Sequence, residues 1–381
     1  MRVLHIVASL SHKWGGPIPV IKGLSEALVR KDVEVSVFAP VKYGEREIVR
    51  PEGVEVHTFR QDLLSKIWTA HSCSLSKVLR KEAKNFDLIH IHEIWHHPHF
   101  AAYLAAQKAS KPYIVAIHGA LEPRALNYKG LKKKIYAALI QKRILNKAAA
   151  IHAITQEEVE HIRAFGVKTP VIIIPNGVDP KEFKDLPPRE EIERFYPELI
   201  GKRVLLFLGR IHPIKGLDIL IKAFGQIAKI EKNLHLLIVG PDEEGYRSQI
   251  ERFLETEGII DRVTFTGMLI RRKKLAVLSR ADIFILSSYS EGFSMAILEA
   301  MVCKLPVVIT RQCHFSEVAE VGAGIVIEPD AKQLADALTT LIDNPMLCKK
   351  MGENGHKFIT EKFTWDKIAN QMIELYHSVL Q

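Results

Sequence analysis

Strand-like and helix-like stretches alternate along this chain. Val3–Val7 and Val33–Phe38 have the length and residue types of buried strands, and Val20–Arg30 between them has apolar residues at helical spacing. Strands that alternate with helices are typical of parallel sheets covered by helices. The pattern therefore predicts an α/β fold made of strand–helix repeats.

The second half of the chain begins like the first. Val204–Leu208 is a predicted strand, Gly209 starts a short basic loop, and Leu217–Ile227 is a predicted helix. Further predicted strands follow at Leu234–Val239, Val263–Phe265 and Ala281–Leu286. Two halves of similar design predict two doubly wound, Rossmann-like domains.

A proline-rich segment separates the halves. Residues 179–200 contain four prolines among mixed charges, which is typical of a linker. We therefore predict a first domain at residues 1–178, a linker at 179–200 and a second domain at 201–362. Neither opening loop contains G-x-G-x-x-G, so a dinucleotide oxidoreductase would lack its usual phosphate turn.

Composition indicates an ordinary soluble protein that binds something anionic. The 381 residues are 47% hydrophobic and 25% charged, with a formal net charge of +9. Nucleotide diphosphates, anionic lipid surfaces and nucleic acids would all suit that charge, but no nucleic-acid-binding motif occurs. No apolar run approaches the roughly 20 residues needed to span a bilayer. The four cysteines form no CxxC pair and nothing resembles a signal peptide, so we expect a cytoplasmic protein.

The most informative segment runs from Ser290 to Met301. Glu291 and Glu299 lie eight positions apart across a Gly-containing loop that leads into a predicted helix, Met295–Val302, with Ser294 as a plausible N-cap. Sugar hydroxyls could donate hydrogen bonds to both carboxylates, and the helix N-terminus could hold a phosphate. The alternative is structural: Glu291 caps the loop and Glu299 pairs with a nearby Lys or Arg.

This segment, followed by Pro306–Thr310, resembles the retaining glycosyltransferases often called family 4 (group 1), which include bacterial mannosyl- and glucosyltransferases. The likeness extends over nearly the whole chain. It implies the GT-B fold, in which two Rossmann-like domains face a central cleft. It also implies that residues 363–381 form a helix that crosses back to the N-terminal domain, which would bind the acceptor.

The resemblance assigns roles to several residues. Arg210 and Lys215, five positions apart on the basic loop, correspond to the pair that binds the donor phosphates and stabilises the leaving nucleotide. His118, which ends the predicted strand Tyr113–Ile117, corresponds to a histidine that contacts the transferred sugar. Alternatively, Arg210 and Lys215 are solvated surface cations, and His118 only caps its strand.

Further donor contacts are expected from Glu291 (sugar hydroxyls), Glu299 (ribose hydroxyls) and backbone or loop positions. The expected donor-binding set is Gly15, Gly16, Arg210, Lys215, Gly240, Glu291, Gly292, Phe293 and Glu299, and the expected catalytic set is His118, Arg210, Lys215 and Glu291. Many relatives have Pro-Asn or Gly-Leu where this chain has Ser294-Met295, so side-chain contacts there are not carried over. The Gly15-Gly16-Pro17 loop could equally be a plain tight turn.

No cofactor or metal is expected. The chain contains no Asp-x-Asp, and in this family Arg, Lys and helix dipoles take the place of a cation. His92-Glu93-Ile94-Trp95-His96 matches the zinc-protease string H-E-x-x-H, but that chemistry requires both histidines on one helix. Here a predicted strand precedes the string and Pro98 follows it.

Residues 124–147 contain eight Lys or Arg and no acid, with apolar residues at helical spacing. Such a segment could contact an anionic membrane, or it could be a surface helix with a core-facing stripe.

Taken together, the motifs and the family resemblance predict a metal-independent transferase. It would move a hexosyl unit from a nucleotide-diphosphate sugar to a saccharide or lipid-linked acceptor in surface polysaccharide synthesis. A nucleotide-sugar 2-epimerase and a non-catalytic nucleotide-sugar binder of the same fold stay open as alternatives.

Overall fold

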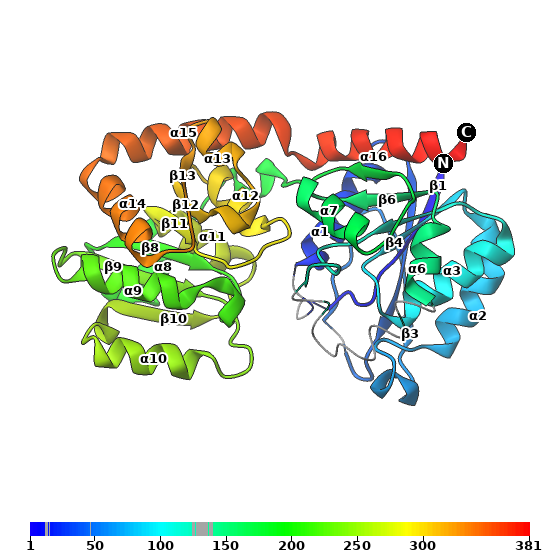
Figure 1. The fold of residues 1–381 in the computed structure, drawn as a ribbon, viewed down its shortest axis with the longest axis horizontal. Helices are drawn as coiled ribbons and strands as arrows, with labels where there is room; N and C mark the ends of the chain where they lie inside the picture. Colours follow the sequence, from blue (N-terminus) through cyan, green and yellow to red (C-terminus); the bar gives the residue numbers. More distant parts are fainter. Residues whose placement is uncertain (12–13, 15, 46, 124–125, 127–135, 137–139) are drawn as a thin grey trace. The chain divides into compact units, whose positions relative to one another are not determined.

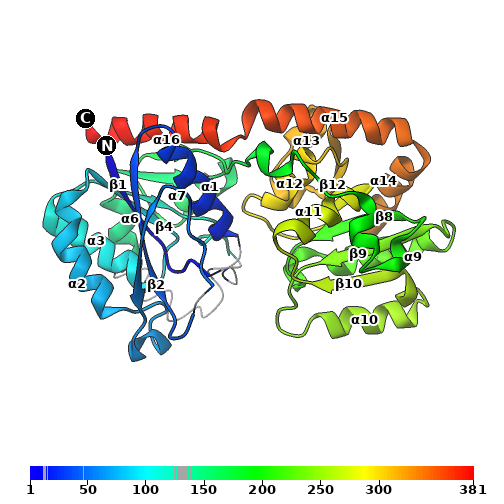
Figure 2. The same cartoon turned by 180° about the vertical axis from the view of Figure 1, so that it is seen from behind.

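The computed structural model describes all residues from 1 to 381 except 12–13, 15, 46, 124–125, 127–135 and 137–139. The chain divides into two compact units. The first contains Met1–Gly177 together with Trp365–Gln381, and the second contains Val178–Thr364. Each unit has its own buried hydrophobic core around a parallel sheet (Figures 1 and 2).

In the first unit, the described residues form a seven-stranded sheet in the order β3-β2-β1-β4-β5-β6-β7, and every pairing is parallel. Its elements are β1 (Arg2–Ile6), α1 (Pro17–Val29), β2 (Glu34–Val41), β3 (Glu55–Arg60), η2 (Leu63–Lys66), α2 (Cys73–Glu82), η3 (Ala83–Asn85), β4 (Leu88–His92), α3 (His97–Ala109), β5 (Tyr113–Ala116), α6 (Lys142–Asn146), β6 (Ala150–Ala153), α7 (Gln156–Ala164), β7 (Val171–Ile173) and α16 (Trp365–Leu380). The order of strands reverses between β1 and β4.

In the second unit, the described residues form a six-stranded parallel sheet in the order β10-β9-β8-β11-β12-β13. Its elements are η5 (Pro180–Phe183), α8 (Arg189–Glu193), η6 (Pro197–Leu199), β8 (Arg203–Leu208), η7 (Pro213–Lys215), α9 (Leu217–Ala228), β9 (Leu234–Val239), α10 (Arg247–Thr256), η8 (Ile260–Arg262), β10 (Val263–Gly267), α11 (Arg271–Arg280), β11 (Ile283–Leu286), α12 (Met295–Val302), β12 (Val307–Thr310), η9 (Arg311–Cys313), α13 (Glu317–Glu320), β13 (Gly324–Ile327), α14 (Ala331–Asp343) and α15 (Pro345–Lys362). Here the order reverses between β8 and β11.

These reversals locate the places where ligands bind in such folds. In open parallel sheets, ligands bind outside the carboxyl ends of the strands where the strand order reverses, because the two neighbouring loops diverge there. In the first unit the loops in question follow β1 and β4, and in the second they follow β8 and β11. Most chain segments singled out in the sequence follow these same strands, whereas His118 follows β5 and Gly240 follows β9.

Residues 179–200, predicted as a linker, are packed into the second unit. Phe183, Ile192 and Leu199 are buried in its core. Arg280, only 3% exposed, also anchors this segment by donating to Glu193 Oε1 over 2.6 Å and to the backbone oxygen of Leu199. The prolines therefore shape short turns whose apolar side chains are buried, and proline content alone could not show that.

The C-terminal helix α16 belongs to the first unit. It packs against α1, where Gly23 leaves room for the Trp365 ring, and a Cβ at position 23 would lie 2.0 Å from Trp365 Nε1. Arg30 at the end of α1 donates to Asp366 over 2.8 Å. The first unit is therefore completed by residues that come after the whole of the second unit in the sequence.

Candidate functional site

The basic loop and the E-x7-E loop meet in the second unit because β8 and β11 are neighbours. The backbone N–H of Tyr289 donates to the Ile214 oxygen over 2.8 Å, which ties one loop to the other. The hydroxyl of Ser287 donates to the Gly216 oxygen over 2.8 Å. These bonds fix Lys215 and Glu291 next to each other.

Lys215 and Glu291 form an ion pair in which the Lys215 ammonium donates to Glu291 Oε1. Their side chains are only 14% and 9% exposed. The same carboxylate oxygen accepts a hydrogen bond from Ser288 over 2.8 Å. The sequence assigned phosphate to one residue and sugar hydroxyls to the other, but the structure joins them in one charged pair that a ligand would have to share.

Glu299 lies in the second turn of α12 and is 7% exposed. Its Oε1 accepts from the Lys274 ammonium over 2.7 Å, so the ion-pair alternative raised from the sequence is present in this structure. A carboxylate has room for further hydrogen bonds, so this pair does not prevent Glu299 from accepting ribose hydroxyls. Lys274, on α11, is a site residue that no sequence motif indicated.

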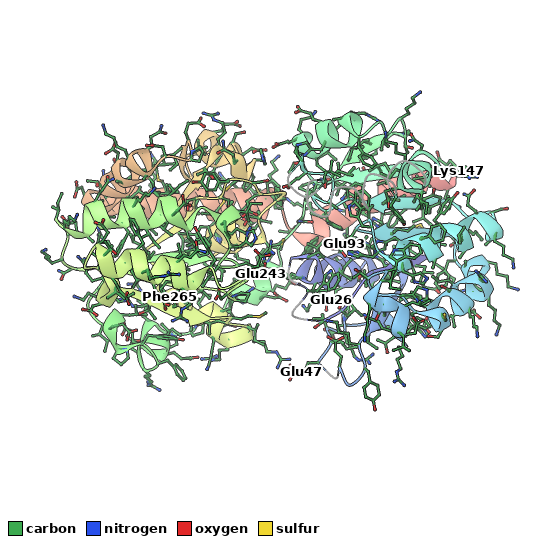
Figure 3. The ribbon with its side chains drawn as sticks, turned by 60° about the horizontal axis from the view of Figure 1, so that its bottom comes forward. Glu26, Glu47, Glu93, Lys147, Glu243 and Phe265 are labelled. Atoms are coloured by element: carbon green, nitrogen blue, oxygen red, sulfur yellow. The ribbon has the colours of Figure 1, made fainter. Side chains whose placement is uncertain are left out.

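Arg210 is 49% exposed and donates to Glu243 over 2.7 Å. Glu243, labelled in Figure 3, follows the Gly240-Pro241-Asp242 turn at the end of β9. Arg210 and Lys215 each pair with a different carboxylate in this structure. Arg210 could turn to an anionic ligand at little cost, since exposed ion pairs contribute little stability.

Gly240 allows β9 to approach the Arg210 loop closely. Its φ is +150°, and a Cβ at this position would lie 1.8 Å from the Gly209 oxygen. No side chain fits in that space, so the glycine sets the path of both loops.

The start of α12 presents backbone rather than side-chain groups. Ser294 is the N-cap residue, as predicted, but its side chain makes no capping hydrogen bond. The Phe293 ring packs on Phe315 and Phe363, with centroid separations of 5.3 and 5.9 Å. The first N–H groups of this eight-residue helix are therefore suited to an anion.

The carboxylates lie in apolar surroundings. Burial, and then the nearby Glu299, raise the pKa of the Cys303 thiol to about 12. Burial and Glu291 act in the same way on Cys313, whose pKa is also raised to about 12. Charges bound here would interact strongly, because the surrounding protein screens them less than water does.

In the first unit, His118 follows β5 in the left-handed region, with φ of +51°. It belongs to a chain of hydrogen bonds. His118 Nε2 lies 3.1 Å from His92 Nδ1, His92 Nε2 lies 2.9 Å from His5 Nδ1, and Tyr376 Oη of α16 lies 3.4 Å from His5 Nε2 and 2.8 Å from His90 Nδ1. Burial, followed by the nearby His152, lowers the pKa of His118 to about 3, so the ring is neutral at pH 7.

Glu93 is a second polar residue at this edge, and the sequence gave it no role beyond the H-E-x-x-H string. Trp14 Nε1 donates to both of its carboxylate oxygens, over 3.3 and 3.2 Å. Burial raises the pKa of Glu93 to about 7. Glu93 and Trp95 have φ of 68° and 77°, and such strained residues gather at functional sites. Figure 3 labels Glu93.

The zinc-protease reading of this string fails. His92 ends strand β4, whereas His96 is the N-cap of α3, so the two histidines do not share a helix face. Within the described residues, three other groups have potential ligand atoms within 4.8 Å of one another: His5 with His90 and His92, Asp62 with His71 and Cys73, and Glu93 with His96 and His99.

The N-terminal glycines are only partly described. Gly15 lies outside the described residues. Gly16 is the N-cap of α1 with an ordinary φ of −49°, and a Cβ there would meet nothing within 4 Å. Gly16 therefore needs no special backbone conformation in this structure, unlike Gly240.

Comparisons with known proteins agree with this arrangement. A family profile described as "Glycosyl transferase 4-like domain" matches residues 15–177, and one described as "Glycosyl transferases group 1" matches residues 188–358. The chain belongs to the group 1 glycosyltransferases. It is accordingly an enzyme that transfers a glycosyl group, and its fold is GT-B, as the sequence predicted.

Among curated relatives of this glycosyltransferase, the MMP alpha-(1->4)-mannosyltransferase of Mycolicibacterium hassiacum is 25% identical and covers 98% of both chains. The phosphatidyl-myo-inositol mannosyltransferase of Mycobacterium leprae is 28% identical over 77% of this chain and 74% of its own. Among solved structures, HepE of Anabaena in complex with UDP-glucose has a TM-score of 0.79 at 21% identity and covers 99% of this chain and all of its own. The sucrose-phosphate synthase of Thermosynechococcus elongatus has a TM-score of 0.80 at 21% identity and covers 100% and 99%.

Two expectations from the sequence concern membranes. Among the described residues, no helix is both long and apolar enough to cross a bilayer. Most of the basic segment 124–147 lies outside the described residues, so its two alternatives stay open.

Proposed function

We propose that this glycosyltransferase is a retaining, metal-independent enzyme that moves a hexosyl unit from a nucleotide-diphosphate sugar to a saccharide acceptor, which is lipid-linked. The second unit would bind the donor, and the first unit would bind the acceptor and contribute His118. The observation that supports this most is the Lys215–Glu291 pair at the carboxyl ends of β8 and β11. A cation and a hydroxyl acceptor held together there suit the junction of phosphate and sugar in such a donor.

The chemistry would be mainly electrostatic. As the bond between the sugar and the diphosphate breaks, negative charge grows on the leaving phosphate. Lys215, Arg210 and the N-terminus of α12 are donors that can stabilise this charge. Glu291 would hold sugar hydroxyls and Glu299 the ribose hydroxyls. We assign no nucleophile, and retention is proposed from the family alone.

Relatives support the donor class without naming the donor. The HepE structure contains UDP-glucose, and two curated relatives are named as mannosyltransferases. The phosphatidyl-myo-inositol mannosyltransferase is named for a lipid acceptor, and that likeness supports the lipid-linked part of the proposal.

The test is a panel of nucleotide sugars offered to the purified protein in the presence of EDTA, with thermal shift and slow release of nucleotide as readouts. We expect one donor to stabilise the protein and to be hydrolysed slowly. Release of nucleotide only with added divalent metal would contradict metal independence. Conversion of the sugar while nucleotide stays attached would favour the epimerase, and binding without either reaction would favour a non-catalytic binder.

Variants locate the site in the same assay. Glu299→Gln should raise the KM for the donor about tenfold or more, because it removes a charged hydrogen-bond acceptor. Lys215→Gln should lower kcat about a hundredfold, since it removes a charge that stabilises the leaving group. Lys222→Gln, an exposed lysine on α9, is the matched control and should behave like wild type. Wild-type rates for both site variants would show that the site lies elsewhere.

A further inference from the structure

Three apolar side chains on the first unit are more exposed than any other large hydrophobic residue in the described part of the chain. They are Ile67 at 86%, Leu63 at 83% and Tyr43 at 81%, and Leu64 beside them is 50% exposed. Leu63, Leu64 and Ile67 come from the short turn η2 and its end, and Tyr43 from the loop after β2. Tyr43 and Leu63 line one surface pocket. The pocket joins Tyr43 to the turn that carries the other three, and the four residues are hereafter called the apolar tip.

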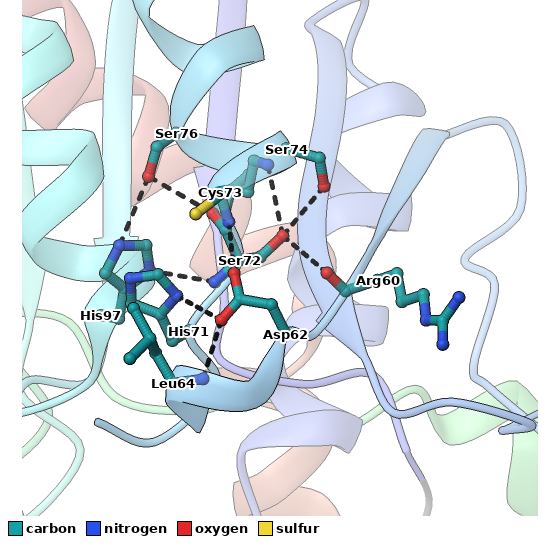
Figure 4. A network of polar contacts seen from close by, with 10 residues as sticks. Arg60, Asp62, Leu64, His71, Ser72, Cys73, Ser74, Ser76 and His97 are labelled. Carbon is teal, nitrogen blue, oxygen red and sulfur yellow. Dashed lines mark hydrogen bonds and ion pairs between the residues drawn. The ribbon is translucent and has the colours of Figure 1, made fainter. Parts of the chain in front are cut away.

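This turn is built rigidly, although it carries exposed apolar residues. Asp62 Oδ1 accepts from the Leu64 N–H over 3.1 Å and from His71 Nδ1 over 2.7 Å, and Oδ2 accepts from the Cys73 N–H over 2.9 Å (Figure 4). Trp68, just after the turn, donates to the Trp95 oxygen over 3.2 Å. These bonds hold in place the turn on which Leu63, Leu64 and Ile67 are exposed.

The charges around the tip select the kind of partner. Lys42, Arg60 and Lys66 line the same pocket as Tyr43 and Leu63, and the Arg60 guanidinium lies 4.4 Å from the centre of the Tyr43 ring. The one carboxylate that lines this pocket, Asp62, is engaged with its own loop as described above. Glu45 is nearby and accepts from the Lys42 backbone N–H over 3.1 Å. Exposed cations thus surround the apolar residues.

The figures place this turn within the first unit. It lies at the end remote from α16 in both views (Figures 1 and 2). Leucine, isoleucine and tyrosine at a projecting turn can enter the boundary between lipid headgroups and acyl chains. Cations near an anionic leaflet add electrostatic attraction to this apolar contact.

We propose that the apolar tip and its cations dock the enzyme on an anionic lipid surface. The surface differs from the basic segment 124–147. A role for this docking in catalysis rests on the proposed lipid-linked acceptor. Docking itself is measured without donor or acceptor, so the docking proposal and the proposed function can fail separately.

The experiment is co-sedimentation of the full chain with phosphatidylcholine vesicles that contain, or lack, phosphatidylglycerol. We expect wild type to bind the vesicles that contain phosphatidylglycerol, and L63S/I67S to bind them about tenfold more weakly or worse, because two side chains no longer enter the lipid. The matched control is I230S/M346S, which removes two other exposed apolar residues, 78% and 75% exposed, on the second unit. It should bind like wild type.

K42Q/K66Q separates charge from apolar contact. Its affinity should fall several-fold at low salt, and the difference from wild type should shrink as salt is raised. Thermal melts of all variants should match wild type, since the changed side chains are exposed. Wild-type vesicle binding by L63S/I67S would overturn the proposal, as would an absence of binding by wild type. A concentration-dependent dimer of wild type that L63S/I67S abolishes would show a protein interface instead.

Discussion

Single residues decide the geometry of the donor side, and Gly240 is the clearest case. Its φ of +150° lies outside the range that residues with a Cβ adopt, and it stands against the Gly209 oxygen just before Arg210. Ionic residues of the site can move to meet a ligand, but this contact between two backbones cannot. The position of the Arg210 loop therefore depends on a residue without a side chain.

Gly240→Ala should lower the free energy of unfolding by more than about 2 kcal/mol, because the Cβ is both strained and in collision with the Gly209 oxygen. Gly245→Ala is the matched control. Its φ is +72° and nothing lies within 4 Å of an added Cβ, so only the backbone cost of about 1 kcal/mol remains. Urea unfolding of the two variants gives the comparison, and equal losses would mean that the collision is relieved.

Sequence motifs identified candidate site residues on the loops, but they did not identify the residues that form ion pairs with them. Glu291, Glu299, Arg210 and Lys215 belong to local motifs. Lys274 and Glu243 are 25 and 33 positions from the residues they bind, on elements without a motif of their own. Local pattern carries no information on which distant charges pair, so the ion-pair alternative for Glu299 could be raised but not decided.

At the scale of elements, strand and helix positions followed from pattern where tertiary packing agreed with it. Leu234–Val239 and Met295–Val302 have the predicted bounds, whereas α1 begins at Pro17 rather than Val20. Proline is favoured in the first helical turn, and that signal was available. The buried histidines were harder to interpret. His5, His90 and His92 lie on adjacent strands with His5 opposite His90, a register that only the folded sheet supplies.

Helix α16 depends on these histidines. Tyr376 is fully buried, and its hydroxyl bonds to His90 and His5. Tyr376→Phe should lower the free energy of unfolding by about 1–3 kcal/mol, because it leaves buried ring nitrogens without a partner. Tyr43→Phe, at an 81% exposed tyrosine, should change it by less than about 0.5 kcal/mol. Unfolding followed by tryptophan fluorescence measures both, and no loss in Tyr376→Phe would mean that water replaces the hydroxyl.

At the scale of the molecule, most histidines whose pKa is lowered by burial belong to the first unit. Burial lowers the pKa of seven histidines of the first unit: to about 3 for His5 and His118, to about 4 for His97 and His152, and well below the ordinary value for His90, His92 and His99. In the second unit, His235 has its pKa lowered to about 4. Burial also raises the pKa of Glu93 and Glu158, both in the first unit, to about 7.

These shifts predict that acid destabilises the first unit. Below about pH 6.5 these histidines take up protons in the unfolded chain but stay neutral in the folded unit. The free energy of unfolding therefore decreases as the pH is lowered. Glu93 and Glu158 act oppositely, because the folded unit takes up their protons near pH 7 and the unfolded chain only near pH 4.5. Seven histidines outweigh two glutamates, and each net proton changes the free energy of unfolding by about 1.4 kcal/mol per pH unit.

Tryptophan fluorescence reports on the first unit. All four tryptophans of the chain (Trp14, Trp68, Trp95 and Trp365) belong to the first unit. Urea unfolding followed by tryptophan fluorescence should therefore show a lower midpoint at about pH 5 than at about pH 7. A midpoint that rises on acidification would mean that the glutamates dominate.

The route of the chain has a consequence for synthesis on the ribosome. The second unit is one continuous segment, Val178–Thr364, inserted into the first, and the first closes only with Trp365–Gln381. Translation proceeds from the N-terminus, so domains usually mature in that order. Here the first unit is completed only after the second unit has been synthesised. All residues of the second unit leave the ribosome before Trp365 and Tyr376 do, so Met1–Gly177 has to wait for residues made after the whole second unit. A released chain that stopped just before residue 365 would thus contain every residue of the second unit but would lack the helix that completes the first.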